Sequence, residues 1–176
     1  HQGTIDKFEG DAIIAFWGAP LDLPNHATVA CHATIEMQRR GEELRKMLRE
    51  QSRPLLFTRM GLNSGPVVVG NMGSAERMDY TMMGDVVNLA ARLEGANKFY
   101  KTFSMISGST YELAKDDIDS RQLDIIRVVG KNEPVPVHEL LARKNETSGE
   151  MSGVVEQYMK GLKLYKDRNF KDAIAE

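Results

Sequence analysis

The chain has 176 residues, of which 41% are hydrophobic and 27% charged, and its formal net charge at pH 7 is −2. This length suffices for one globular domain with a short appendage. Acidic and basic residues are spread along the chain without a basic block, so nothing in the charge pattern indicates nucleic-acid binding. The single cysteine, Cys31, excludes an intrachain disulfide and is typical of a reducing, cytoplasmic setting. No apolar run has the length of a membrane span.

The N-terminal residues predict a hairpin followed by a long helix. Residues 4–8 and 12–17 are apolar-rich runs, and Gly10-Asp11 between them is a turn signal. We therefore expect a β-hairpin with Asp11 at its tip. After a proline-containing loop, Asn25 is a candidate N-cap for a helix over about 26–51, whose second half is mostly solvent-facing charge.

The middle of the chain alternates between strand and helix patterns. Residues 74–83 are polar and rich in methionine and carry no clear assignment. The other predicted elements are strands at 55–62 and 66–73 joined by a turn at 63–65, a helix at 85–97, a strand at 103–107, a short helix at 108–116, and strands at 123–129 and 134–141. This interleaving predicts an α/β or α+β domain.

The C-terminal segment differs in character from the rest. Residues 143–152 are polar and predict a linker, and residues 153–176 predict a helix, a turn and the start of a second helix. The spacing of its aromatic and small residues resembles the start of a tetratricopeptide repeat, carried by Tyr158, Gly161, Leu162, Tyr165, Phe170 and Ala173. The alternative is an amphipathic helical tail that packs on the domain.

Three segments together resemble the class III adenylyl and guanylyl cyclase family. They are TIDKFEGDAIIAFWGAP (4–20), GDVVNLAARLE (84–94) and VVGKNEPVPVHEL (128–140). The resemblance covers residues 1–142 and implies a ferredoxin-like α/β domain with an antiparallel-rich sheet and flanking helices. It also implies a head-to-tail homodimer with two active sites at its interface. The family's first strand and the helices after it precede the motif, and the chain opens with His1 without an initiator methionine, so we interpret it as part of a longer protein.

The resemblance implies that Asp11 binds metal. Cyclisation of ATP requires the ribose 3′-hydroxyl to attack the α-phosphate while pyrophosphate leaves, and two Mg²⁺ or Mn²⁺ ions held by carboxylates assist it. Asp11 matches the second of the family's two metal-binding aspartates; the alternative is a turn-forming aspartate beside Gly10. The first aspartate is expected upstream of His1. Asp6 is not a substitute, because it falls within the purine-side motif.

Two residues match the positions that read the purine in this family. Lys7 lies three residues before Gly10, and Thr81 lies three residues before Gly84. A lysine at the first position resembles the adenylyl enzymes, and the Lys/Thr pair resembles a bacterial-type subclass of them. The Thr81 hydroxyl can accept from the adenine 6-amino group or donate to a guanine carbonyl. The alternatives are a solvated lysine and an ordinary strand threonine.

Three further residues match the family's catalytic positions. Asn88 and Arg92 are four residues apart and share a helix face. The resemblance implies that Asn88 orients the ribose and that Arg92 stabilises charge on the α-phosphate, whereas a plain polar stripe is the alternative. Lys131 matches a lysine that contacts the terminal phosphates. The family usually has another lysine two residues earlier, where this chain has Val129.

The sequence thus predicts an adenylate cyclase, with two other functions left open. One is a non-catalytic cyclase-like domain that dimerises and relays a signal; the retained Asp11, Asn88 and Arg92 argue against it. The other is a guanylate cyclase, against which Lys7 argues. Glu9 departs from the hydrophobic residue common before the Gly-Asp pair, and its role stays open. We expect a cytoplasmic domain, compatible with an upstream sensor or membrane segment, that acts on ATP and binds no nucleic acid.

Overall fold

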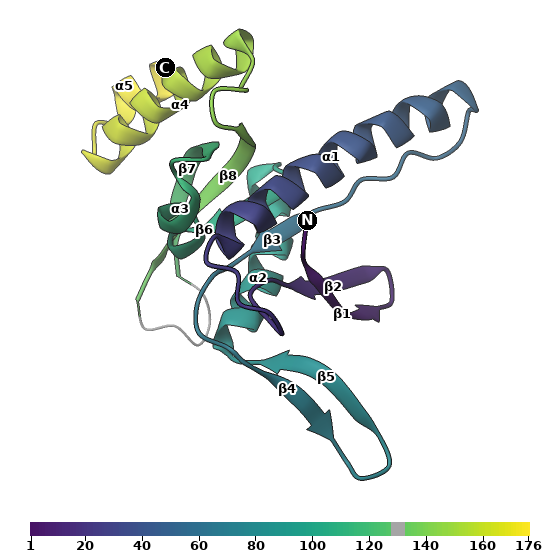
Figure 1. Cartoon of the computed structure of the whole chain (residues 1–176). Coiled ribbons are helices and arrows are strands. Elements are labelled where there is room, and N and C mark those ends of the chain that lie inside the picture. Colours follow the sequence, from purple (N-terminus) through teal and green to yellow (C-terminus); the bar gives the residue numbers. More distant parts are fainter. Residues whose placement is uncertain (128–132) are drawn as a thin grey trace.

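The chain is represented by a computed structural model that describes residues 1–127 and 133–176 (Figure 1). Its centre is a four-stranded sheet in the order β3-β6-β8-β7. These strands are β3 (Met60–Leu62), β6 (Ser104–Ser107), β8 (Val135–Arg143) and β7 (Ile118–Ile126). Strands β3 and β6 are parallel, whereas β8 is antiparallel to both of its neighbours. The predicted α+β class with an antiparallel-rich sheet is confirmed.

Helices cover both faces of this sheet because its strands are apolar on both sides. Neighbouring residues of a strand point to opposite faces, and in β6 Met105 and Ile106 are both fully buried. Ile106 packs in a cluster with Cys31 from α1 (His26–Glu50) and Ala114 from α3 (Gly108–Ala114). Met105 packs in a second cluster with Leu89 and Leu93 from α2 (Asp85–Tyr100). Helix α2 is therefore held on the face opposite α1.

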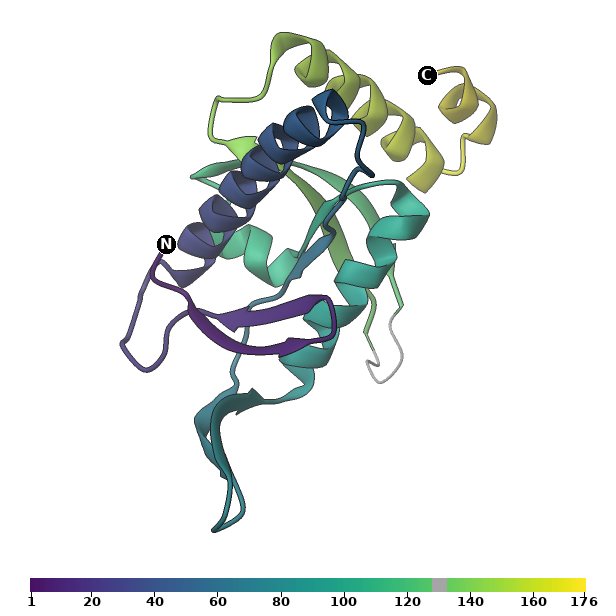
Figure 2. The same ribbon diagram turned by 90° about the vertical axis from the view of Figure 1, so that its right-hand side faces the viewer.

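Two hairpins complete the domain, each forming its own two-stranded sheet. One pairs β1 (Thr4–Glu9) with β2 (Ala12–Phe16), and the other pairs β4 (Val68–Gly73) with β5 (Met78–Met83). Figure 2 shows the β4–β5 hairpin extending away from the rest of the chain. The polar, methionine-rich stretch without a clear sequence assignment is thus largely a strand.

The structure corrects several predicted boundaries. The strand expected over 55–62 begins only at Met60, and it pairs with β6, so β3 and β4 lie in different sheets. The strand expected from residue 123 begins at Ile118. Helix α2 runs to Tyr100, three residues beyond its predicted end. These differences arise because pairing and packing with distant segments decide where elements end.

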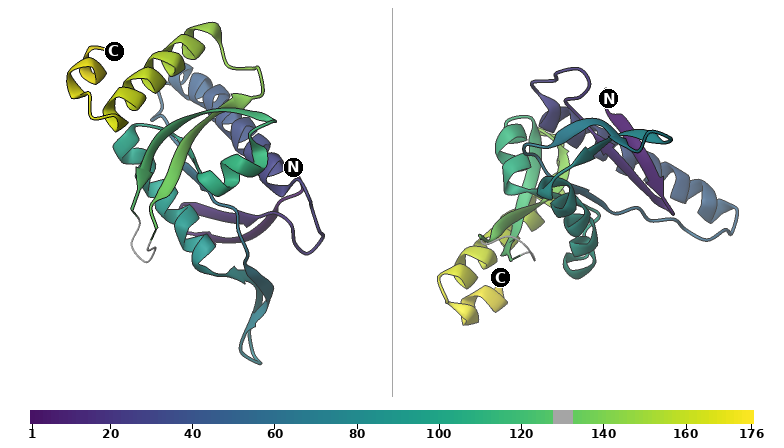
Figure 3. Two further views of the ribbon diagram at one scale, coloured as in Figure 1. Left: turned by 90° about the vertical axis from the view of Figure 1, so that its left-hand side faces the viewer. Right: turned by 90° about the horizontal axis from the view of Figure 1, so that it is seen from below.

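The C-terminal helices lie on the side of the molecule away from the β4–β5 hairpin (Figure 3). They are α4 (Gly149–Lys166) and α5 (Phe170–Ala175), so helix begins inside the stretch predicted as a linker. The Tyr158 hydroxyl donates to the Leu123 carbonyl at 3.0 Å, and the Arg121 guanidinium lies 4.7 Å from the Tyr158 ring centroid. Helix α4 therefore contacts β7. The resemblance of this segment to a tetratricopeptide repeat stays a prediction.

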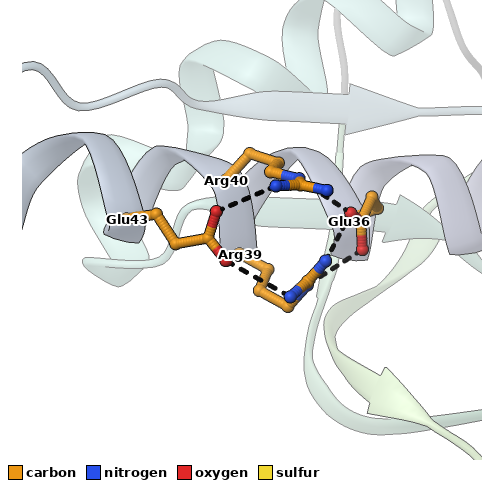
Figure 4. Close-up of polar contacts among 4 residues, drawn as sticks. All are labelled: Glu36, Arg39, Arg40 and Glu43. Carbon is orange, nitrogen blue, oxygen red and sulfur yellow. Dashed lines mark hydrogen bonds and ion pairs between the residues drawn. The ribbon is translucent and has the colours of Figure 1, made fainter.

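The second half of α1 is charged, as its sequence predicts (Figure 4). Glu36 accepts hydrogen bonds from Arg39 and Arg40, and Glu43 bridges the same two guanidiniums. These contacts lower the pKa of Glu36 to about 2. Because the cluster faces water, it contributes little to stability and mainly keeps this face soluble. Across residues 1–127 and 133–176, no helix combines the length and apolar character that a membrane span requires.

Candidate functional site

The turn between β1 and β2 presents Asp11 at the tip of a rigid hairpin. Gly10 has φ +62°, a conformation that favours glycine, and Asp11 follows it at the second central position, an arrangement typical of a type II′ turn. The Asp11 side chain is exposed. The predicted hairpin and the position of Asp11 at its tip are confirmed. A carboxylate held in this way is open to a cation in solvent.

The two predicted purine-reading residues lie on different hairpins and meet at a third residue. Thr81 in β5 donates its hydroxyl hydrogen to Oδ2 of Asp6 in β1 at 2.9 Å. Lys7 Nζ lies 3.7 Å from the same oxygen. Asp6 thus joins Lys7 and Thr81, which are 74 residues apart along the chain (81 − 7). Further contact between the hairpins comes from Phe16 and Tyr80, whose ring centroids are 6.2 Å apart.

Helix α2 carries Asn88 and Arg92 on one exposed face. Its opposite face is buried through Leu89 and Leu93. The helix lies so close to β3 that a Cβ added at Gly61 would come within 2.3 Å of the Ala90 carbonyl oxygen. Only a glycine fits there, so Gly61 allows α2 to seat directly on the edge of the sheet.

Asn97 fixes the C-terminal half of α2. Its fully buried amide donates to the carbonyl oxygens of Met60 and Leu93 at 3.0 Å, and its Oδ1 accepts from the Thr102 hydroxyl at 2.8 Å. Near the start of the helix, Asn63 donates to the Val86 carbonyl at 2.9 Å. These bonds connect α2 to β3 and its following loop, and they fix the helix that carries Asn88 and Arg92.

The structure brings some of the predicted site residues together and leaves others apart. Lys7 and Thr81 share a contact through Asp6, and Asn88 and Arg92 share a helix. Asp11 and Glu9 are exposed on the β1–β2 hairpin. Lys131 and the neighbouring Val129 lie outside the described residues.

A metal ion would find only part of its ligand set in the described residues. These contain no group of three or more His, Cys, Asp or Glu side chains arranged to hold an ion. Asp11 nevertheless fits one ligand of Mg²⁺, which is commonly held by one or two carboxylates together with substrate phosphates. Asp11 could therefore supply one ligand of such a site.

Two residues of the core have pKa values that burial shifts strongly. Burial lowers the pKa of His138, which is stacked on Tyr111 with ring centroids 4.1 Å apart, to about 4. Burial also raises the pKa of the Cys31 thiol to about 12. His138 and Cys31 are thus packed core residues.

Sequence reasoning missed Asp6, Gly61 and Asn97 as residues that support the site. The signal for Asp6 was its place beside Lys7. Its contact with Thr81 joins two hairpins that are far apart in the sequence, so no local pattern predicts it. Asn97 follows Leu93 at helical spacing, so it lies on the buried face of α2. A polar residue at that position indicates a hydrogen-bonded role.

Comparison with known proteins agrees with this geometry. The family described as "Adenylate and Guanylate cyclase catalytic domain" matches residues 5–142. Adenylate cyclase 1 of Rhizobium meliloti is 38% identical over 141 residues, 80% of this chain and 21% of that protein. The terminal-differentiation-specific adenylate cyclase of Dictyostelium discoideum is 33% identical over 98% of this chain and 8% of its own length. The chain thus spans only about a fifth of the first of these relatives and less than a tenth of the second.

Solved structures of both purine specificities are similar. The adenylyl cyclase CyaB from P. aeruginosa superposes with a TM-score of 0.71 at 35% identity, covering 83% of this chain and 75% of that one. The guanylyl cyclase Cya2 superposes with a TM-score of 0.73 at 32% identity, covering 82% of this chain and 72% of that one. The family match covers most of the chain, and the fold agrees with it. The chain therefore belongs to the family of adenylate and guanylate cyclase catalytic domains.

Proposed function

We propose that this domain is an adenylate cyclase, which converts ATP to 3′,5′-cyclic AMP and pyrophosphate. The observation that carries the proposal is the meeting of Lys7 and Thr81 at the Asp6 carboxylate. Adenine presents an acceptor, N1, beside a donor, the 6-amino group. An ammonium can donate to N1, and a hydroxyl can accept from the 6-amino group. Guanine presents the opposite pattern, an N1–H donor beside a carbonyl acceptor.

The remaining residues supply positioning and charge. Asn88 orients the ribose so that its 3′-hydroxyl faces the α-phosphate. The planar guanidinium of Arg92 stabilises the charge that develops on the α-phosphate. Lys131 binds the terminal phosphates, which leave as pyrophosphate. Because Asn88 and Arg92 lie on one exposed face of α2, a single nucleotide can contact both.

Asp11 is the metal-binding residue of this proposal. Its exposed carboxylate would hold Mg²⁺ or Mn²⁺, two per site, together with a second aspartate and the substrate phosphates. When bound, these ions neutralise phosphate charge and lower the pKa of the 3′-hydroxyl. The backbone of Asp11 is held in place because the turn joins two paired strands.

Exposed apolar side chains on both hairpins support a homodimer with shared sites. Phe8 and Ile13 on β1–β2 are 68% and 64% exposed, and Val68 and Met83 on β4–β5 are 68% and 62% exposed. Large exposed apolar side chains in one region indicate a protein interface. In the proposed dimer, one chain supplies Asp11 and the other supplies the purine-reading residues, Asn88, Arg92 and Lys131.

The test is turnover of ATP and GTP by the complete natural protein with Mg²⁺ or Mn²⁺. We expect cyclic AMP from ATP, with kcat/KM for ATP exceeding that for GTP. In Lys7→Glu, ATP turnover falls far more than GTP turnover, because a carboxylate cannot donate to adenine N1. Lys46→Glu, the same change at an exposed position of α1, is the matched control and leaves the preference unchanged.

The similarity to the guanylyl cyclase Cya2 gives the same assay a second purpose. A preference for GTP in the wild-type protein would favour guanylate cyclase activity instead. Equal loss with both nucleotides in Lys7→Glu would remove the purine-reading role of Lys7. Absence of any cyclic nucleotide would favour a non-catalytic, dimerising domain.

A further inference from the structure

Asp6 is a buried carboxylate for which the proposed reaction gives no role. Its side chain is only 3% exposed, although it lies on a hairpin strand whose neighbouring residues Ile5 and Lys7 are exposed. One oxygen, Oδ2, contacts both the Thr81 hydroxyl and the Lys7 ammonium. Such a burial requires compensating partners, and both partners of Asp6 are the residues proposed to read the purine.

A β-bulge makes this arrangement possible. In the β1–β2 ladder Ile5 pairs with Ala15 and Lys7 pairs with Ile14, so Asp6 is the extra residue without a partner on β2. Consecutive residues of a regular strand point to opposite faces, which would separate Asp6 from Lys7. A bulge re-aims a side chain locally, and here it lets both neighbours reach the same side.

The direction of the Asp6–Thr81 hydrogen bond is fixed by chemistry. A hydroxyl has one hydrogen to donate and two lone pairs that accept, whereas a carboxylate only accepts. The Thr81 hydrogen is therefore used by Asp6, and Thr81 faces any further partner as an acceptor. An acceptor suits the 6-amino group of adenine and opposes the carbonyl oxygen of guanine.

The backbone opposite Thr81 leaves space for such a partner. Thr81 pairs with Gly70 in β4, and a Cβ placed at Gly70 would meet no atom within 4 Å. Directly opposed residues of an antiparallel pair lie on the same face of the ladder. Open space thus adjoins Thr81 on that face.

We propose that Asp6 is a specificity-determining positioning residue, which selects adenine by holding the Thr81 hydroxyl as an acceptor and the Lys7 ammonium beside it. The proposal rests on the cyclase function proposed above. Asp6 acts through Thr81 and Lys7 and does not itself touch the purine. Replacing the carboxylate by an amide allows the amide to donate to Thr81, which frees the threonine hydrogen for a guanine carbonyl.

The first test compares Asp6→Asn with wild type in the complete natural protein, using kcat/KM for ATP and for GTP. We expect the ATP-to-GTP ratio to fall about tenfold, through lower ATP turnover and unchanged or higher GTP turnover. Asp79→Asn, the same change at an exposed aspartate of the neighbouring hairpin strand, is the control and leaves the ratio unchanged. An equal loss with both nucleotides in Asp6→Asn would overturn the proposal.

A double-mutant cycle separates an effect through Thr81 from a general one. In Thr81→Val the hydroxyl is gone and only the contact of Asp6 with Lys7 remains, so adding Asp6→Asn should lower the ATP-to-GTP ratio by clearly less than it does when Thr81 is present. A fall as large as in the protein that retains Thr81 would show that Asp6 does not act through Thr81 and would overturn its role in holding that hydroxyl.

A substrate analogue tests the acceptor role without any variant. Purine riboside triphosphate lacks only the 6-amino group and keeps N1, so wild type should use it about tenfold less well than ATP. Equal use of the two would overturn the assignment of Thr81 as an acceptor held by Asp6. If wild type forms cyclic AMP and only the Asp6 results fail, the cyclase function stands; if it forms no cyclic nucleotide, both proposals fail.

Discussion

At the residue scale, the proposed reaction depends most heavily on Arg92. It lies on the exposed face of α2, and its permanent charge and planar geometry suit two phosphate oxygens. We expect Arg92→Ala to lower kcat and kcat/KM together by about 10²–10³, as the loss of a transition-state contact does. Steady-state cyclase kinetics measure this. Arg49→Ala, at an exposed position of α1, is the control and should retain wild-type rates.

His138 makes stability depend on pH. Burial holds its pKa near 4, below the usual 6.5, although Glu112 raises it and Lys166 lowers it further. The unfolded chain therefore binds a proton on this side chain before the folded chain does, and stability falls as pH drops from about 6.5 towards 4. We expect His138→Phe, which keeps the stack on Tyr111, to remove about 2 kcal/mol of this pH dependence. Urea unfolding at pH 4.5 and 7.5 measures this. An equal change in the free energy of unfolding between the two pH values in wild type and variant would contradict it.

Local sequence patterns were enough to predict where some of the candidate site residues lie. Asp11 at a hairpin tip follows from Gly10-Asp11 between strand formers, and the shared face of Asn88 and Arg92 follows from their spacing. Asp6 was passed over because its partner Thr81 is far away along the chain. The β-bulge at Asp6, which allows the contact with Thr81, has no signature in the sequence of the strand.

At the element scale, the packing of α2 on β3 decides where the face that carries Asn88 and Arg92 lies. A methyl group at Gly61 would collide with the backbone of α2 at Ala90 and Glu94. We expect Gly61→Ala to destabilise the fold by about 1–3 kcal/mol and to lower cyclase activity, because the helix must shift. Chemical denaturation and turnover at saturating ATP report the two effects.

Gly95 offers the matched control within the same helix. A Cβ placed there would meet no atom within 4 Å. Alanine is the better helix former, so Gly95→Ala should stabilise the fold by about 0.5–1 kcal/mol and leave activity intact. Equal destabilisation by both substitutions would contradict the close packing of β3 against α2.

The elements differ in how far sequence predicted them. Helix α1 and the β1–β2 hairpin were predictable because helical periodicity and turn residues lie within each segment, although the candidate N-cap Asn25 makes no side-chain capping hydrogen bond. Strand β5 was not, because its exposed and polar residues carry no period and only pairing with β4 makes it a strand. Strand β3 was overestimated, because residues 55–59 are apolar enough for a strand but pair with no other strand in the described part of the chain.

At the scale of the whole molecule, one chain holds only part of the proposed site. Asp11 projects from a hairpin tip, whereas Asn88 and Arg92 lie on a helix, and both hairpins carry exposed apolar residues. Sequence could predict this only through resemblance to the family, since no local pattern encodes a partner's surface. If each dimer has two shared sites, two variants that are inactive alone should regain activity when they are mixed.

The most direct measurement mixes Asp11→Ala and Arg92→Ala in the complete natural protein, each inactive alone. In a mixed dimer one shared site carries both lesions, and the other carries neither. After equal mixing and exchange of subunits, cyclic AMP production should recover to about a quarter of the wild-type rate. Mass spectrometry of differently tagged chains confirms that mixed dimers form. Mixed dimers that form but remain inactive would contradict a cyclase site shared between two chains.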